Sequence, residues 1–330
     1  MTLVRNCRNL QVVPCLAVFA LACALWLAPT GAKAQQTQKV PRVGVHWLSP
    51  GSVFLSPMLQ RLRELGYVDG KNIHFEYADK GTFEQQAAEL LEKQVDLIFV
   101  VSDQPARAVL RATKSKPLVM VACDAVASGL IESLARPGAN LTGVSCNSTE
   151  LAAKRLQMLQ EIVPRLSRVA VLYNRDAPGK EVELRLTQTA AQQLGITILP
   201  QGIASGADVE LAFAAMQSDR ADGVIVLGDG LTVDRRQPIA DQGARYKLPM
   251  ACAFRANVVA GCLFSYGPNL SEMYRLSADY VDKVLKGAKP ADLPVQEPTR
   301  FEFILNLKTV KALGVAIPQT VRLRVDDVVE

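Results

Sequence analysis

The sequence has 330 residues, of which 49% are hydrophobic and 21% charged. A chain of this length and composition can bury a large core, which disfavours disorder and allows either one large domain or two of ordinary size. Its formal net charge is +5, and subtracting the three positive charges of an N-terminal segment that we expect to be removed leaves +2, too little to predict a polyanionic partner such as nucleic acid.

The N-terminus has the three parts of a secretory signal. Two arginines precede an apolar stretch from about 10 to 27, and the A-x-A motif at 32–34 follows. We therefore predict a signal peptide at 1–34, a mature chain starting at Gln35, and a periplasmic location. An uncleaved membrane anchor and a lipid on Cys23 are the alternatives.

The first half of the mature chain alternates strand and helix patterns. The helices are amphipathic, and the strands are short apolar runs bounded by polar turns. The expected strands are 41–48, 72–78, 95–101 and 117–123, and the expected helices are 56–67, 83–94 and 104–113. This alternation is typical of a parallel sheet covered by helices on both faces.

The second half starts the same order again. A strand at 141–145 leads into a helix that begins near Thr149, and the segment 167–174 then matches 41–48. The matching segments keep offsets of about 126 to 132 residues, which indicates one duplicated unit. A long helix (270–287), a proline-rich connector (288–299) and a last strand (300–307) follow.

These patterns predict an α/β protein of two similar Rossmann-like lobes with parallel sheets, joined by a hinge. Lobe 1 is expected to comprise 40–146 plus about 267–296, and lobe 2 to comprise 147–266 plus about 297–330. Ligands of open α/β sheets bind outside the carboxyl ends of the strands, so two such sheets enclose a cleft.

Three segments carry a specific resemblance. The segments 64–79, 133–145 and 265–318 are similar to the ABC transporter substrate-binding protein family that includes tryptophan-type binders, and the likeness extends over the mature chain from Pro41. The resemblance implies a type I periplasmic binding-protein fold, capture of a small solute between the lobes, and delivery to a membrane permease with a separate ATPase. It implies neither a cofactor nor a particular ligand, and we expect a monomer.

Candidate ligand-binding residues follow the predicted strands in both lobes. Helix N-termini offer N–H groups to a carboxylate, Asp side chains can hold an ammonium, and aromatic rings can stack on a flat solute, so an amino-acid-like or aromatic solute is the expected class. The alternatives are that the Asp residues only cap helices and that the aromatic rings only pack at the hinge. The candidates are Ser49, Ser52, Ser102, Asp103, Asp124 and Asn147 in lobe 1, with Asn174, Asp229, Phe254 and Tyr266 in lobe 2 or at its edge.

Asp103 departs from the family pattern, which often has a small residue or Thr at this position. If Asp103 faces the cleft, it favours a solute with a positive group.

The mature chain keeps an even set of cysteines, namely Cys123, Cys146, Cys252 and Cys262. Three pairings are possible for four cysteines in an exported chain. Cys123 and Cys146 end consecutive predicted strands, and we place the other two at corresponding positions in lobe 2. The expected disulfides are therefore 123 with 146 and 252 with 262, and four buried free thiols are the alternative.

Two other functional classes compete with solute capture for transport. For an exported enzyme the chain offers only His46 and His74, and it lacks G-x-S-x-G, H-E-x-x-H, P-loop and G-x-G-x-x-G motifs. His46 is a conceivable base, but a lone His is more often packed. We therefore expect no enzyme activity and no metal site. A sensor domain of a membrane receptor would use the same fold, and the sequence does not separate it from a transport protein.

Overall fold

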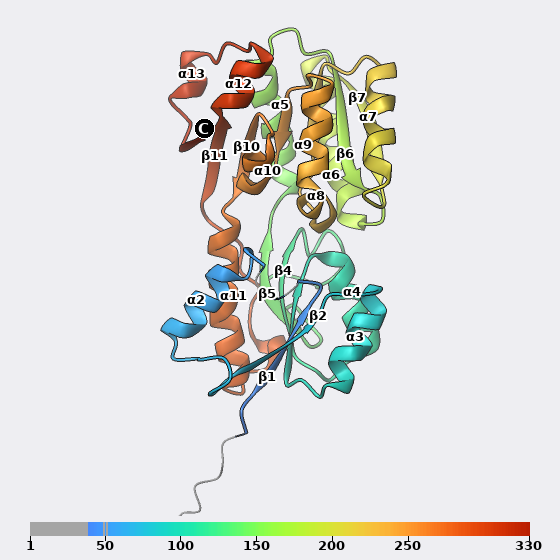
Figure 1. The fold of residues 1–330 in the computed structure, drawn as a ribbon. Helices are drawn as coiled ribbons and strands as arrows, with labels where there is room; N and C mark the ends of the chain where they lie inside the picture. Colours follow the sequence, from blue (N-terminus) through green and yellow to red (C-terminus); the bar gives the residue numbers. More distant parts are fainter. Residues whose placement is uncertain (1–38, 49, 51) are drawn as a thin grey trace, which may run out of the picture. The chain divides into compact units, whose positions relative to one another are not determined.

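Two mostly parallel β-sheets organise the chain (Figure 1). The structure is a computed structural model that describes residues 39–48, 50 and 52–330, and Val40–Glu330 form one compact unit. The predicted signal peptide and Ser49 lie outside the described residues. Within the described residues, no helix is both long and apolar enough to span a bilayer.

The first sheet has five parallel strands in the order β2-β1-β3-β4-β5. Its strands are β1 (Arg42–His46), β2 (His74–Ala78), β3 (Leu97–Val101), β4 (Leu118–Cys123) and β5 (Leu141–Cys146). Its helices are α2 (Ser56–Glu64), α3 (Phe83–Glu92), α4 (Asp103–Ala112) and, from the end of the chain, α11 (Leu270–Leu285) followed by the short η1 (Pro290–Asp292).

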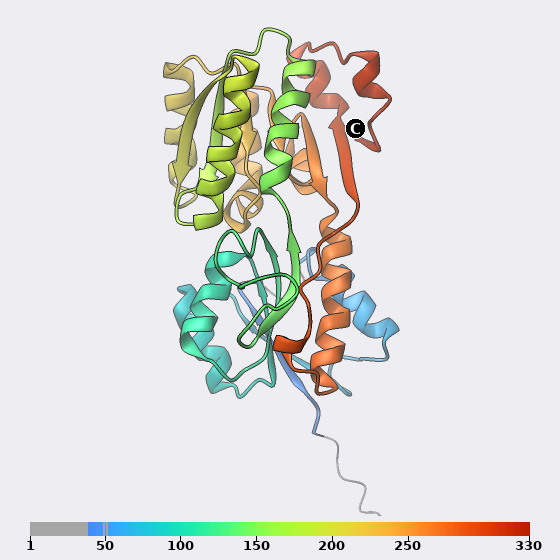
Figure 2. The ribbon, with the colours of Figure 1, turned by 180° about the vertical axis from the view of Figure 1, so that it is seen from behind.

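Both faces of this sheet are buried, which explains why its central strands β3 and β4 are continuous apolar runs. In β3, Phe99 packs into a cluster with α2 and α11, whereas Ile98 and Val100 pack on the other face with α3 and α4. Figures 1 and 2 show α2 beside α11 on one face and α3 beside α4 on the other. Successive side chains of a strand point to opposite faces, so each must be apolar here.

The second sheet has seven strands in the order β12-β11-β10-β9-β8-β6-β7, with only the β10–β11 pair antiparallel. Its strands are β6 (Arg168–Asn174), β7 (Thr197–Ile203), β8 (Gly223–Val226), β9 (Met250–Cys252), β10 (Phe264–Pro268), β11 (Phe301–Asn306) and β12 (Asp327–Val329). Its helices are α5 (Thr149–Ile162), α6 (Pro178–Leu194), α7 (Asp208–Ser218), α8 (Gly230–Asp234), α9 (Arg236–Arg245), α10 (Arg255–Ala260), α12 (Leu307–Leu313) and α13 (Gln319–Arg322).

The two sheets share one connectivity, since β7-β6-β8-β9-β10 repeats the order β2-β1-β3-β4-β5. The predicted α/β class with two similar parallel sheets is therefore confirmed. The described chain passes from one sheet to the other after β5, after β10 and before β11 (Figure 2). These connections place the carboxyl ends of strands from both sheets around a common space.

The four described cysteines lie in pairs, one pair in each sheet. Cys123 and Cys146 are register partners at the ends of β4 and β5, where a disulfide joins them with their Cα atoms 4.3 Å apart. A second disulfide joins Cys252 and Cys262, whose Cα atoms are 6.5 Å apart. Cys262 does not hold the position that corresponds to Cys146, because it precedes β10, and the register partner of Cys252 is Ser265.

Disulfide formation in protein produced in an oxidising compartment is a testable prediction. Peptide mapping without reduction should recover 123 linked to 146 and 252 linked to 262, each bridge stabilising the fold by about 2–4 kcal/mol. A reduced and alkylated sample serves as the control and should yield four separate cysteine peptides. Four free thiols, or a link between the sheets, would contradict the prediction.

Candidate solute-binding site

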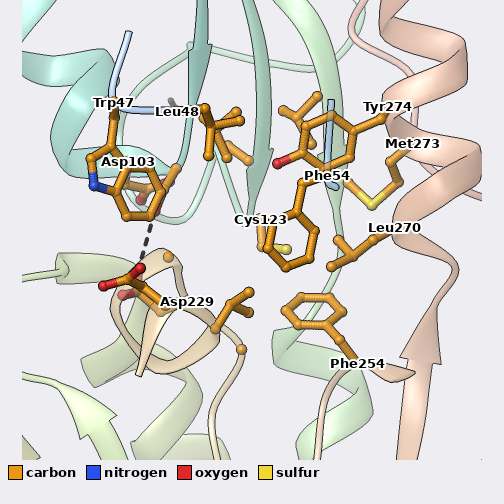
Figure 3. A pocket seen from close by; sticks show the side chains of 18 of the residues that line it. Trp47, Leu48, Phe54, Asp103, Cys123, Asp229, Phe254, Leu270, Met273 and Tyr274 are labelled. Atoms are coloured by element: carbon orange, nitrogen blue, oxygen red, sulfur yellow. Dashed lines mark hydrogen bonds between the residues drawn. The ribbon is translucent and has the colours of Figure 1, made fainter. Parts of the chain in front are cut away.

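A pocket of about 180 Å³ lies between the carboxyl ends of strands from the two sheets (Figure 3). The first sheet contributes residues that follow β1 and residues at the carboxyl ends of β3 and β4. The second contributes residues that follow β8 and β9 and Lys180 of α6, and α11 forms a further wall. The pocket is lined by Trp47, Leu48, Ser52, Phe54, Val101, Ser102, Asp103, Val121, Ala122, Cys123, Lys180, Gly228, Asp229, Gly230, Val233, Asp234, Phe254, Leu270, Met273 and Tyr274.

One side of the pocket is aromatic and apolar. Phe54 stacks on Tyr274 with ring centroids 6.4 Å apart and planes 25° apart, and Figure 3 shows Phe254, Leu270 and Met273 close to this pair. The burial of Tyr274 raises the pKa of its hydroxyl, which therefore stays protonated. Such a surface favours a flat apolar group, because rings gain from offset stacking as well as from burial.

The other side is polar, and it is built from residues that follow β1, β3 and β8. Ser102 is the N-cap of α4, and its hydroxyl donates a long hydrogen bond of 3.4 Å to Oδ2 of Asp229. Asp229 is the N-cap of α8, where Oδ1 accepts from the backbone N–H of Leu231 at 2.8 Å and from Nδ2 of Asn174 at 2.9 Å. Figure 3 shows Asp103 and Asp229 on the same side of the pocket as Trp47.

The environment of Asp103 disfavours its charged form. Asp103 is the first residue of α4, and it is 5% exposed. Burial raises the pKa of its carboxyl to about 6, and the charge of Asp229 adds to the rise. A hydrogen bond with Ser128 and the charges of Lys180 and Arg107 act in the opposite direction. The carboxyl therefore takes up a proton near pH 6, far above the usual range for Asp.

A buried ion-pair network adjoins the pocket through Lys180, which is one of the lining residues. The Lys180 ammonium on α6 lies 3.1 Å from Oδ2 of Asp124, which follows β4, and 2.7 Å from Oε2 of Glu183. The Arg155 guanidinium on α5 lies 3.0 Å from Oε1 of Glu183. Burial by itself would raise the pKa of Glu183, but Lys180 and Arg155 hold it below its usual value. The Lys180–Asp124 pair joins elements of the two sheets.

Five of the residues predicted from the sequence line this one pocket. They are Ser52, Ser102, Asp103, Asp229 and Phe254. Their contribution to binding stays a prediction.

The other described candidates lie outside the lining of the pocket. Asp124 accepts the backbone N–H of Ser148 at 2.8 Å and that of Thr149 at 3.0 Å, so it holds the start of α5 as well as Lys180. Asn147 is half-buried, and its Oδ1 accepts from the Thr149 hydroxyl at 3.0 Å. Tyr266 belongs to β10, and its ring lies 6.4 Å from that of Phe301.

Asn174 touches the pocket only through Asp229, to which its side chain donates. Asp124 and Asp229 both cap helices, because their carboxylates accept hydrogen bonds from backbone N–H groups at the starts of α5 and α8.

Sequence reasoning missed several pocket residues. Trp47 was missed because the expected strand ran from 41 to 48, whereas β1 ends at His46 and Trp47 directly follows it. Met273 and Tyr274 could not, because they lie on the apolar stripe of α11 and resemble core residues in sequence. Lys180 in the first turn of α6 reads as a solvated charge, although the residue is 3% exposed.

His46 does not line the pocket. It is fully buried, its Nε2 lies 2.9 Å from the Phe83 carbonyl oxygen, and burial lowers the pKa of its ring. A neutral, packed imidazole of this kind is the structural role considered above for a lone His. Among the described residues, no group of three or more His, Cys, Asp and Glu could hold a metal ion.

Comparisons with known proteins identify the family of this chain. A family model for ABC transporter substrate binding protein matches residues 55–329. A tyrosine-binding protein of Clostridioides difficile is 26% identical over 260 residues, which are 77% of this chain and 74% of that protein.

Two solved structures have a similar fold. A conserved domain protein of Vibrio cholerae has a TM-score of 0.81 at 26% identity, with 88% of this chain and 100% of that chain covered. The ABC domain of Streptococcus pneumonia in complex with L-Trp has a TM-score of 0.80 at 24% identity, with 88% and 99% covered. The family model spans most of the chain, and the expectation of a binding protein without enzyme activity agrees with it. The protein belongs to the ABC transporter substrate-binding protein family.

Proposed function

We propose that the solute of this transport protein is an aromatic compound with an amine, of the amino-acid type. The observation that carries the proposal is the division of one pocket into an aromatic side with Phe54, Phe254 and Tyr274 and a polar side with Asp103 and Asp229. Rings bind a flat apolar group, and carboxylates bind an ammonium through charge-assisted hydrogen bonds. The tyrosine-binding relative and the L-Trp complex support this class of solute.

The proposal includes the path of the solute. The protein would capture it in the periplasm, after export through the N-terminal signal, and deliver it to a membrane permease that a separate ATPase drives. The two sheets and their helices would act as lobes that close on the solute about the three connecting segments. Contacts of Ser102 with Asp229 and of Lys180 with Asp124 across the two sheets support a closed form around the pocket.

A thermal-shift screen of the mature protein tests the proposal. Aromatic amino acids and amines should raise the melting temperature by several degrees, because a ligand at a hundred times its dissociation constant adds about 2.7 kcal/mol to the folded state. Aliphatic amino acids and nucleosides serve as controls. The bound solute should be recovered unchanged after long incubation. A shift with nucleosides or sugars alone, or chemical conversion of the solute, would contradict the proposal.

A further inference from the structure

Asp103 is a buried carboxyl group that forms a hydrogen bond with Ser128 but is not accounted for by helix capping or by an ion pair. The burial of the Asp229 carboxylate is explained in part by its role as the N-cap of α8. The N-cap of α4 is Ser102, so Asp103 does not serve that purpose. Across the described part of the chain, no Lys or Arg side chain forms an ion pair with Asp103 or Asp229. Buried carboxylates without a cation are costly, and such groups are found where a ligand supplies the partner.

The cation that lines the pocket is already engaged. Lys180 is the one Lys or Arg among the described lining residues, and its ammonium lies 3.1 Å from Asp124 and 2.7 Å from Glu183. Of the three carboxylates that line the pocket in the described part of the chain, Asp234 lies 3.3 Å from the Arg235 guanidinium. Asp103 and Asp229 have no such partner within the described residues, so they give the polar side an excess of negative charge. A solute ammonium relieves this excess, whereas a solute carboxylate brought to the same side adds to it.

The two sides of the pocket also fix the order of groups in the solute. Figure 3 shows Asp103 and Asp229 together beside Trp47, with Phe54 and Tyr274 across the pocket. A solute whose amine is joined to a ring by a short chain places both groups against their matching surfaces. A carboxylate on that chain has no cationic side chain left to receive it among the described lining residues.

We infer that Asp103 is a specificity-determining residue which, with Asp229, selects the solute by its protonated amine and makes a carboxylate on the solute dispensable. The class of solute is then the arylalkylamines, with the aromatic amino acids as members that carry an extra group. The inference rests on the proposed function, because it concerns the same pocket.

Calorimetric titration of the mature protein above pH 7 with three related probes tests the inference. Tyramine has the amine alone, tyrosine has amine and carboxylate, and 3-(4-hydroxyphenyl)propionate has the carboxylate alone. Tyramine should bind at least as tightly as tyrosine, and the propionate should bind about a hundredfold more weakly. The variant Asp103→Asn should weaken tyramine binding by about tenfold or more, since hydrogen bonds between charged groups are the strong ones, and should not weaken the propionate.

A second Asp103 variant and a control variant complete the experiment. Asp103→Thr repeats the test with a shorter uncharged side chain, in case the amide disturbs the fold. Asp176→Asn removes an exposed negative charge outside the pocket and should change no affinity by more than about twofold. Binding of tyrosine and the propionate without tyramine, or an equal loss for all probes in both Asp103 variants, would overturn the inference and leave the proposed function standing. If no aromatic probe binds, both are wrong.

Discussion

Replacing Glu183 by alanine should lower the free energy of unfolding by about 3–5 kcal/mol, because it leaves two buried cations without their shared partner. Both carboxylate oxygens are in use, Oε1 with Arg155 at 3.0 Å and Oε2 with Lys180 at 2.7 Å, and the side chains of Arg155 and Glu183 are 0% exposed. Lys180 keeps Asp124, but Arg155 keeps only neutral acceptors, including the Tyr266 carbonyl oxygen. Urea unfolding at neutral pH measures the loss.

An exposed ion pair provides the matched control for this variant. Glu210 lies 3.3 Å from Arg245, and the two side chains are 71% and 60% exposed. Glu210→Ala should change the free energy of unfolding by less than about 1 kcal/mol, since water screens such pairs. Equal effects of the two variants would show that the buried network contributes no more than a surface pair, and would contradict the prediction.

Replacing Gly230 by alanine should weaken solute binding by about 5- to 150-fold, which is the affinity equivalent of the 1–3 kcal/mol that overpacking costs. A Cβ atom on Gly230 would lie 2.5 Å from the Trp47 ring and 3.0 Å from Cβ of Ser102. Both neighbours belong to the other sheet, so the clash arises only when the pocket is closed. Calorimetry with tyrosine or tyramine measures the loss of affinity.

Gly179→Ala is the control for this effect, because it adds the same methyl group near the same boundary. A Cβ atom there would meet Cβ of Ser128 at 3.4 Å, Cβ of Asp124 at 3.7 Å and Oδ2 of Asp103 at 3.8 Å, all of which are ordinary contacts that displace no neighbour. Both glycines have φ angles that alanine adopts. Gly179→Ala should therefore keep its affinity within about twofold. An unchanged affinity in Gly230→Ala would contradict the proposed closure of the lobes.

The fold was largely predictable because parallel sheets with two buried faces leave a plain pattern in the sequence. The apolar runs of β3 and β8 and the repeated strand–helix order predicted both sheets. The position of Cys262 was not predictable, because the repeat is interrupted by the short helix α10, which places this cysteine before β10.

The candidate site was predictable only where polar residues follow strands, as Ser102, Asp103 and Asp229 do. Polar residues in such places stand out against the apolar runs. Phe54, Met273 and Tyr274 did not stand out, because an apolar side chain that lines a pocket and one that fills a core bury the same kind of surface and have the same sequence pattern. Lys180 depends on Asp124, which lies 56 residues earlier in the chain, and no local pattern reveals that pairing.

Fluorescence of Trp47 during a titration tests the central claim most directly. The sequence has two tryptophans, and Trp26 lies in the predicted signal peptide, so a chain that starts at Gln35 reports from Trp47 in the pocket. Tyrosine or tyramine should change the emission saturably with one solute per chain, and Phe254→Ala should shift the midpoint to higher concentration. Saturable binding of an aromatic solute that leaves Trp47 emission unchanged and is insensitive to Phe254→Ala would contradict the assignment of this pocket as the binding site.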